Sequence, residues 1–243
     1  MQERTLILNK VRKLSELFKK GEIPQQHQHE LNPGIEPNDR INYLYFTLPV
    51  SLNFQRSSPA MWRAAMATYD DPATNYLFYP ETVVTTPWEK VQNDLLKHKL
   101  SLQRNKHTEI WTRLSKTFVN YFDADPRKFF EMYDYDIAKT IPAMQKERKR
   151  DFPYLSGNKM ANYWHFILHH YTDANFKNLD QISIIPDTHV LQSSIVLGLS
   201  DEKSSPIEVA QRWFDLLEAS EFKPIDLHSI LWNWSRNNFK PEV

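Results

Sequence analysis

"FPYLSGNKMANYW", residues 152–164, joins a short turn to an amphipathic stretch. Gly157 and Asn158 both tolerate a positive φ, which a tight turn between two helices requires. The apolar residues that follow recur at helical spacing, and they are Met160, Trp164, Ile167, Leu168 and Tyr171. The stretch therefore predicts a hairpin between two helices, with Lys159 in the first turn of the second helix.

Lys159 is the group in this hairpin that could carry out chemistry. Exposed amides at such a helix start can hold a phosphate, and Ser156, Gly157 and Asn158 would surround it. The positive end of the helix dipole disfavours an ammonium group there, and a neutral amine is a nucleophile. Taken alone, the stretch is also compatible with an ordinary surface lysine at a helix start.

A second stretch, "SIIPDTHVLQSSIVLGLS" at residues 183–200, predicts another helix. Asp187 precedes apolar residues at helical spacing, and Gly198 stands where the helix should end. As an N-cap, Asp187 would accept hydrogen bonds from the first amides of this helix. The stretch alone favours that structural role.

The composition limits the classes of protein that this chain can belong to. Of its 243 residues, 41% are hydrophobic, which is enough for a real core. The 30 basic and 30 acidic residues balance, so the chain is not coated in positive charge, although 146–150 is a local basic run. The absence of cysteine excludes disulfides, cysteine-ligated zinc and iron–sulfur clusters, and it fits an intracellular protein of the cytoplasm, nucleoid or nucleus. No apolar run is long enough to cross a membrane.

Helical periodicity dominates the chain and predicts an all-α fold. Helices are expected at about 87–100, 105–122, 125–133, 158–171, 188–198, 205–219 and 226–236. Another helix should begin with Ser58 as its cap and Pro59 in its first turn. The β-branched runs at 82–86 and 182–185 are expected to be extended connections.

The first 40 residues differ from the rest in pattern. They begin with an amphipathic helix, expected to dock on the core, and continue into a connector rich in glycine and proline. The expected organisation is therefore 1–40 as helix and connector, and 41–243 as the main helical core. His27 and His29 in the connector, and the pair His165 and His169, lack an evident third ligand, so no metal site is expected.

Together the two quoted stretches resemble the helix-hairpin-helix DNA glycosylase superfamily, which includes endonuclease III and the 8-oxoguanine glycosylases. In its bifunctional members a lysine opens the helix after the hairpin, and a segment close to V-D-T-H-V follows 20 to 30 residues later. Here Lys159 takes the place of that lysine, and Asp187 stands 28 residues further on within "PDTHV".

The resemblance continues in the correct order over about residues 40–240. "LNFQRSSPAMW" at 52–62 looks like the early helix end where a glutamine, here Gln55, enters the DNA stack. "LQRNKHTEIWTRL" at 102–114 looks like the family's L-x-N-x-K-A-x-x-I stretch, and "PIDLHSILWNWSR" at 224–236 looks like its closing helix.

One departure concerns the hairpin, which in the family usually reads G-x-G before the lysine. Leu155 stands in place of the first glycine. The archaeal 8-oxoguanine glycosylases also lack the standard G-x-G and keep a lysine followed by methionine, as in Lys159-Met160. This sequence therefore looks closer to them than to endonuclease III.

The resemblance implies a two-lobed helical bundle that binds double-stranded DNA containing a damaged base, as a monomer. Lys159 would attack the sugar and form a Schiff base, and Asp187 would stabilise the developing positive charge. Gln55 would fill the hole left by the flipped base. The DNA backbone would contact the hairpin residues 156–158 and also His189 and Lys149.

Candidates for the base pocket are Phe54, Asp226, Trp232 and Trp234, although core packing is the simpler role for an aromatic residue. No cofactor is expected. The favoured function is a glycosylase and lyase for an oxidised purine such as 8-oxoguanine. The alternatives are a glycosylase for another damaged base or modified nucleoside, and a helical DNA- or protein-binding module without catalysis.

Overall fold

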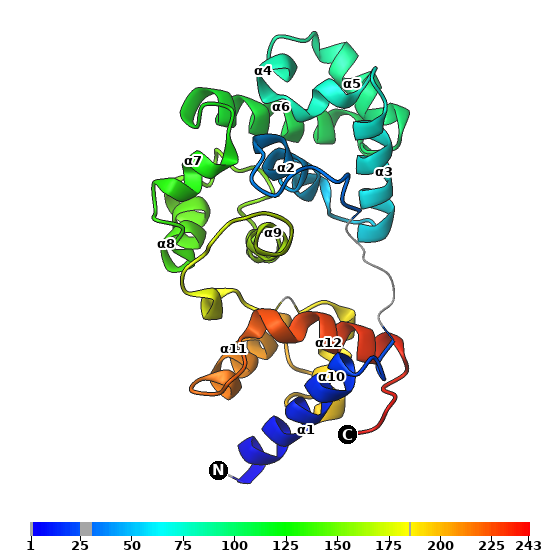
Figure 1. The fold of residues 1–243 in the computed structure, drawn as a ribbon, viewed down its shortest axis with the longest axis vertical. Helices are drawn as coiled ribbons and strands as arrows, with labels where there is room; N and C mark the ends of the chain where they lie inside the picture. The colour runs from blue at the N-terminus through cyan, green and yellow to red at the C-terminus, as the bar shows by residue number, and fades with distance from the viewer. Residues whose placement is uncertain (1, 25–30, 185) are drawn as a thin grey trace. The chain divides into compact units, whose positions relative to one another are not determined.

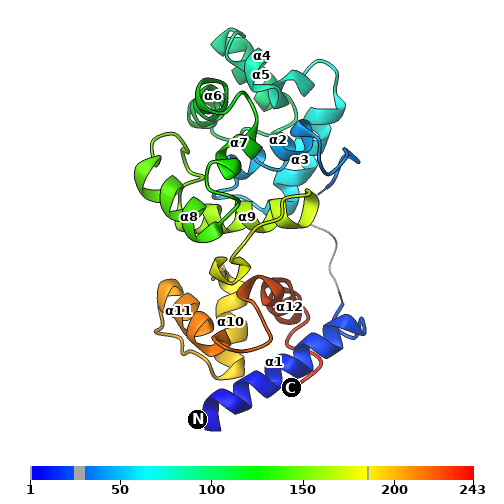
Figure 2. The same ribbon diagram turned by 60° about the vertical axis from the view of Figure 1, so that its left-hand side comes forward.

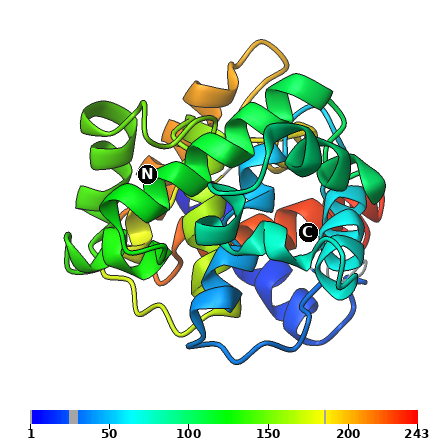
Figure 3. The same ribbon diagram turned by 90° about the horizontal axis from the view of Figure 1, so that it is seen from above.

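The computed structural model describes residues 2–24, 31–184 and 186–243, so His27 and His29 lie outside the described residues. These ranges form helices and loops and contain no β-strand, as the three ribbon views show (Figures 1, 2 and 3). The all-α prediction is therefore confirmed. The chain divides into two compact units, Met1–Gln28 with Leu179–Val243 as unit 1 and His29–Asn178 as unit 2.

Unit 2 is a cluster of helices between α2 and α9. In chain order they are α2 (Arg40–Tyr45), η1 (Pro49–Leu52), α3 (Ser58–Asp70), η2 (Asn75–Phe78), α4 (Pro80–Val83), α5 (Trp88–Lys97), α6 (Arg104–Tyr121), α7 (Pro126–Glu131), α8 (Ile137–Pro142), η3 (Ala143–Glu147) and α9 (Asn158–Tyr171). Aromatic side chains fill its core, since Tyr45, Phe46 and Trp62 pack ring against ring with centroids 5.0–5.8 Å apart.

Two indole hydrogen bonds fix α9, the helix that carries Lys159, within unit 2. Trp164 on α9 donates to the Thr47 hydroxyl over 2.8 Å, and Trp62 on α3 donates to the Tyr163 hydroxyl over 3.1 Å. Both indole rings are fully buried. Because a buried N–H group is costly to leave unpaired, these bonds specify the position of α9 as well as stabilising it.

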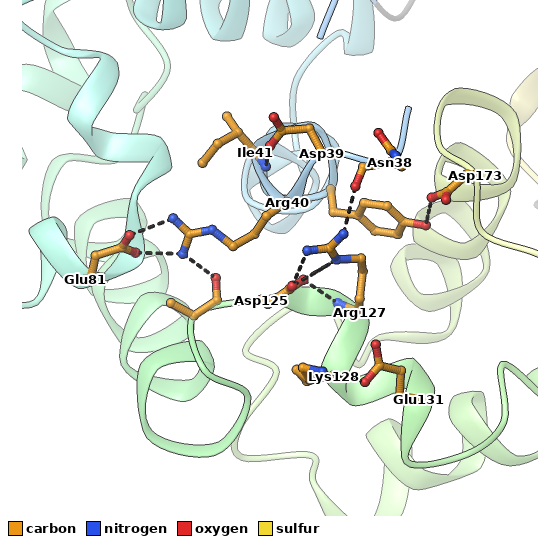
Figure 4. A network of polar contacts seen from close by, with 12 residues as sticks. Asn38, Asp39, Arg40, Ile41, Glu81, Asp125, Arg127, Lys128, Glu131 and Asp173 are labelled. Atoms are coloured by element: carbon orange, nitrogen blue, oxygen red, sulfur yellow. Dashed lines mark hydrogen bonds and ion pairs between the residues drawn. The ribbon is translucent and has the colours of Figure 1, made fainter. Parts of the chain in front are cut away.

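Polar side chains connect the residues at the start of α2 with helices α4 and α7 of unit 2 (Figure 4). Arg40 donates to both carboxylate oxygens of Glu81, over 2.7 and 3.2 Å. Arg127 binds the Asp125 carboxylate, with a shortest contact of 2.6 Å, and also donates to the Asn38 carbonyl over 2.7 Å. The network therefore links the start of α2 to α4 and α7.

Unit 1 combines the N-terminal helix with the C-terminal quarter of the chain. Its helices are α1 (Gln2–Lys19), η4 (Leu179–Gln181), α10 (Thr188–Leu197), α11 (Pro206–Leu217) and α12 (Pro224–Arg236). Ile7, Val11 and Leu14 of α1 belong to the same buried cluster as Trp213 and Trp234. The expected amphipathic N-terminal helix is present, and its apolar face packs into the core of this unit.

Most expected helices are present within a few residues of their predicted bounds, including 158–171 and 188–198. The 82–86 prediction is wrong in part, because Pro80 starts the single helical turn α4 and Thr82 and Val83 lie within it. The predicted cap is shifted by one residue, since α3 already begins at Ser58. The Ser58 hydroxyl instead accepts a hydrogen bond from Asn53 over 2.8 Å. No described helix is long and apolar enough to cross a membrane.

Candidate functional site

Lys159 lies in the first turn of α9 and lines a surface pocket of unit 2 with a volume of about 410 Å³. The pocket also contains Gln55 and Phe54, two residues that the sequence singled out from a stretch about 100 positions earlier. Its other lining residues are Asn53, Arg56, Ser58, Tyr154, Gly157, Asn158 and Met160. The fold thus brings a primary amine, an amide and an aromatic ring to one pocket.

The start of α9 presents backbone amides without a side-chain cap. Gly157 occupies the N-cap position and has no side chain that could accept a hydrogen bond from the first turn. Asn158, Lys159 and Gly157 are all exposed. Since uncapped amides and the positive end of the helix dipole both favour an anion, this turn is suited to a phosphate group.

The turn before α9 is built differently from the prediction. Gly157 has an extended conformation, with φ −63° and ψ 146°, so it does not supply the positive φ of the turn. Tyr154 does, with φ 61°. A Cβ at position 157 would lie 3.2 Å from the Tyr154 carbonyl oxygen, a tight contact that glycine avoids. Asn158 is already the first residue of the helix.

Gln55 lies in the loop between η1 and α3, at the edge of the pocket. Its backbone is left-handed, with φ 52°, and its side chain is exposed. The Gln55 side-chain carbonyl accepts a hydrogen bond from Gln103 over 3.2 Å. Next to it, Arg56 donates to the carbonyls of Leu100 and Lys99 over 2.7 and 3.2 Å. These bonds hold the loop against the chain that precedes α6, and Gln55 stays exposed.

An aromatic stack at the pocket was not recognised in the sequence. Tyr154 lies on Phe54 with ring centroids 4.1 Å apart and planes inclined by 13°. The Lys106 ammonium is 5.0 Å from the Phe54 centroid and 4.9 Å from that of Tyr154. Tyr154 remains 37% exposed, so its ring offers surface to a ligand in the pocket. Phe54 is one hundred residues away in sequence, and no local pattern predicts this pairing.

The other two DNA-binding candidates of unit 2 differ in exposure. Ser156 is buried, and its hydroxyl donates to the Lys149 carbonyl over a long 3.4 Å. The Lys149 side chain is exposed. Ser156 therefore contributes to the shape of the hairpin, and Lys149 has the exposure that a phosphate contact needs.

Asp187 and His189 belong to unit 1, where Asp187 is the N-cap of α10. Its carboxylate accepts hydrogen bonds from the amides of His189 and Val190, both over 3.0 Å. Gly198 ends the helix in the left-handed conformation, with φ 83°. Both predicted ends of α10 are thus confirmed. One Asp187 oxygen makes the two cap bonds, and the side chain is only half-buried.

His189 lies in a small cluster with α12. Its Nδ1 is 3.1 Å from the Ser235 hydroxyl, and its ring meets the edge of Trp232 with centroids 5.2 Å apart. The Arg236 guanidinium lies 5.2 Å from the Trp232 centroid. Trp232 is half-buried, so it retains some of the surface that a base-pocket residue needs.

The remaining pocket candidates of unit 1 have structural roles. Trp234 is 1% exposed, donates to the Pro241 carbonyl over 2.9 Å and packs in the core, so it offers no surface to a base. Asp226 is exposed in the first turn of α12, and its carboxylate accepts from the Lys223 amide over 3.2 Å. Trp232 follows Asp226 by six positions, about 9 Å along the helix, and the two residues lie on different faces. These two residues therefore do not share one pocket wall.

His165 is committed to the core of unit 2. It is fully buried, its Nδ1 is 2.7 Å from the Ala161 carbonyl, and its Nε2 is 2.7 Å from the Thr140 hydroxyl. Burial lowers its pKa to about 4, so it is neutral at neutral pH. Both ring nitrogens are occupied, and among the described residues no group of three or more possible ligands could hold a metal ion.

Comparison with known proteins identifies the fold. No family model matches the sequence, and no curated protein sequence matches it. Among solved structures, the chain is similar to a trapped endonuclease III–DNA covalent intermediate in an estranged-adenine complex, with a TM-score of 0.57 at 16% sequence identity. The match covers 96% of this chain and 84% of that one. The chain therefore has the endonuclease III fold, as the resemblance implied.

Proposed function

We propose that this protein is a DNA glycosylase of the helix-hairpin-helix superfamily that excises a damaged base and cleaves the resulting site through Lys159. The proposal rests mainly on one observation. An exposed lysine at the uncapped start of α9 lines the same pocket as Gln55, within the endonuclease III fold. The similar structure is itself a covalent protein–DNA intermediate, which supports a covalent mechanism here.

In the proposed reaction, the Lys159 amine attacks C1′ of the flipped nucleotide. The bond from C1′ to the base breaks, and the base leaves with the electron pair and takes up a proton. The attached amine gives up one proton, the bond from C1′ to O4′ breaks, and O4′ takes up a proton. A protonated Schiff base then joins Nζ to C1′ of the opened sugar. Loss of a C2′ proton then expels the 3′ phosphate by β-elimination. Asp187 would stabilise the positive charge on the sugar and accept a proton.

The favoured substrate is an oxidised purine such as 8-oxoguanine in double-stranded DNA. This choice rests on the resemblance of the Lys159-Met160 pair and the long Lys159–Asp187 spacing to the archaeal 8-oxoguanine enzymes. In unit 2, Phe54 and Tyr154 offer partly exposed aromatic surface on which a base could stack, and in unit 1 Trp232 does so separately. Gln55 would replace the flipped base in the duplex. Gly157, Asn158, His189 and Lys149 would contact the DNA backbone, and the buried Ser156 would support the shape of the hairpin.

The test is covalent trapping. The protein is incubated with a labelled duplex containing 8-oxoguanine, borohydride is added, and a covalent protein–DNA band is sought. We expect a band with the unchanged protein and with Lys139→Gln, which alters an exposed lysine on another helix, and none with Lys159→Gln. A band that appears only on an abasic duplex would retain the lysine mechanism and reject the base assignment. No band on either duplex would reject the lyase proposal.

A further inference from the structure

The exposed face of α6 is basic. Lys106, Arg113 and Lys116 are exposed and fall within about 80° of arc at 100° per residue. The opposite side of the helix buries Trp111 and Phe118 in the core of unit 2. Within α6 this polar face carries a single acidic residue, Glu109. The helix thus presents a line of positive charge to solvent although the whole chain is neutral.

A second basic segment, residues 146–154, runs beside α6 in the opposite direction. Three contacts place it there. At the end of α6, the Arg148 guanidinium lies 5.4 Å from the Tyr121 centroid. Further back, the Thr117 hydroxyl donates to the Asp151 carbonyl over 2.8 Å, and at the start of α6 the Lys106 ammonium lies 4.9 Å from the Tyr154 centroid. The segment adds the exposed side chains of Lys146, Lys149 and Arg150 to those of the helix.

The six exposed cations of the two segments have no carboxylate partner among the described residues. Arg148 differs, since it pairs with Asp151 over 3.3 Å. Within the two segments, Glu109 and Glu147 are the acidic residues that form no ion pair. An array of unpaired cations attracts a polyanion, and salt weakens that attraction.

The basic face leads to the Lys159 pocket. Its first cation, Lys106, touches the Phe54 and Tyr154 rings, and both rings line that pocket. From Lys106 to Lys116 the helix advances about 15 Å. A strand of B-form DNA carries one phosphate per roughly 3.4 Å of axis, so this length spans about four nucleotides.

We propose that this face, made of Lys106, Arg113 and Lys116 with Lys146, Lys149 and Arg150, binds the sugar–phosphate backbone of the DNA that flanks the target nucleotide. It extends the DNA contact from the pocket along α6, away from the reacting atoms. The inference rests on the proposed function for the nature of the polyanion. It does not depend on the lysine chemistry.

The test compares two double variants that lose the same charge. Arg113→Gln/Lys116→Gln alters the proposed surface, and Lys19→Gln/Lys20→Gln alters exposed lysines at the end of α1. Binding is measured by fluorescence anisotropy between 50 and 200 mM salt, on a duplex with an abasic analogue at its centre. A long duplex has about twelve base pairs on each side of the analogue. A short duplex has about three on each side, and non-nucleotide linkers join its two strands at the ends.

On the long duplex we expect the α6 variant to lower the slope of log affinity against log salt by about 1.8, the value for two lost phosphate contacts. The α1 variant should leave the slope unchanged, and on the short duplex all proteins should behave alike. An unchanged slope for the α6 variant, or equal losses with both variants or on both duplexes, would overturn the inference. Borohydride trapping on the short abasic duplex separates the two proposals, because it should need Lys159 and not Arg113 or Lys116.

Discussion

Asp187 has one role that the structure shows and one that is proposed, and two substitutions can separate them. As N-cap it accepts two amide hydrogen bonds. Asparagine is as good an N-cap as aspartate, whereas alanine loses about 1 kcal/mol. Only the carboxylate, however, can stabilise a cationic sugar or accept a proton.

We therefore predict that Asp187→Asn unfolds in urea within about 0.5 kcal/mol of the unchanged protein, while its excision rate falls by about a hundredfold or more. Asp187→Ala should lose about 1 kcal/mol of stability, and its excision rate should fall as far as that of Asp187→Asn. If Asp187→Asn excised the base at the normal rate, Asp187 would be a structural cap only.

Tyr154 allows a direct test of the hairpin conformation. Because its φ is 61°, an alanine there keeps the left-handed strain, whereas glycine relieves it. We predict that Tyr154→Gly is more stable than Tyr154→Ala by about 1 kcal/mol in urea unfolding. Both variants lose the stack on Phe54 equally, so the comparison isolates the backbone. Equal stabilities, or a more stable alanine variant, would place the positive φ elsewhere in the turn.

At the scale of the helix, α9 contains a histidine that should make stability depend on pH. The pKa of His165 is lowered to about 4 by burial, against an ordinary value of 6.5. Between these values the unfolded chain binds a proton that the folded chain excludes, so the free energy of unfolding falls as the pH falls from 6.5 towards 4. Above pH 6.5 the contribution is complete. Its surroundings are Phe130, Trp164 and Phe176, whose rings carry no charge.

We predict that the free energy of unfolding drops by about 2 kcal/mol through His165 between pH 7 and pH 5. His165→Gln should be less stable at pH 7 and should show a correspondingly smaller drop, as measured by urea unfolding at each pH. His107, whose pKa burial also lowers to about 4, should respond in the same way. If the free energy of unfolding of His165→Gln fell by the same amount between pH 7 and pH 5 as that of the unchanged protein, groups other than His165 would cause the fall.

The longer helices could be predicted from the sequence, and the shortest ones could not. Helices α9 and α10 were predictable because each has roughly three to four turns of apolar periodicity and a residue suited to its start or end. The single turn α4 and the irregular path from α8 through η3 were not, since four to six residues contain too few repeats. Pro142 ends α8, and the chain continues as one π-helical turn.

The candidate site was predictable where a local motif marks it and not where it depends on distant packing. Lys159, Gln55 and Asp187 each belong to a short motif, so sequence alone could select them. The stack of Tyr154 on Phe54 and the burial of Trp234 result from tertiary contacts that leave no local pattern. Gly157 was selected for a positive φ, but its φ is −63°, and what the structure shows there is a close approach to the Tyr154 carbonyl oxygen.

At the scale of the whole chain, the N-terminal helix is part of a unit whose other residues begin about 160 positions later. Val11 of α1 is 1% exposed and belongs to the cluster around Trp213 and Leu227, and the Arg12 side chain binds Glu221 over 2.6 Å. The α1 helix therefore contributes buried side chains to the core of unit 1. Loss of α1 packing should destabilise α10, α11 and α12 although they lie far away in sequence.

We predict that Val11→Asp lowers the free energy of unfolding by about 4 kcal/mol, since it places an unpaired carboxylate in the core. Hydrogen exchange followed by mass spectrometry should show faster exchange in α10, α11 and α12. Leu6→Asp is the matched control, because Leu6 lies on the same helix and is 58% exposed, so its cost should stay within about 0.5 kcal/mol. If both variants behaved alike, or if exchange increased only within α1, then α10, α11 and α12 would form their core without α1.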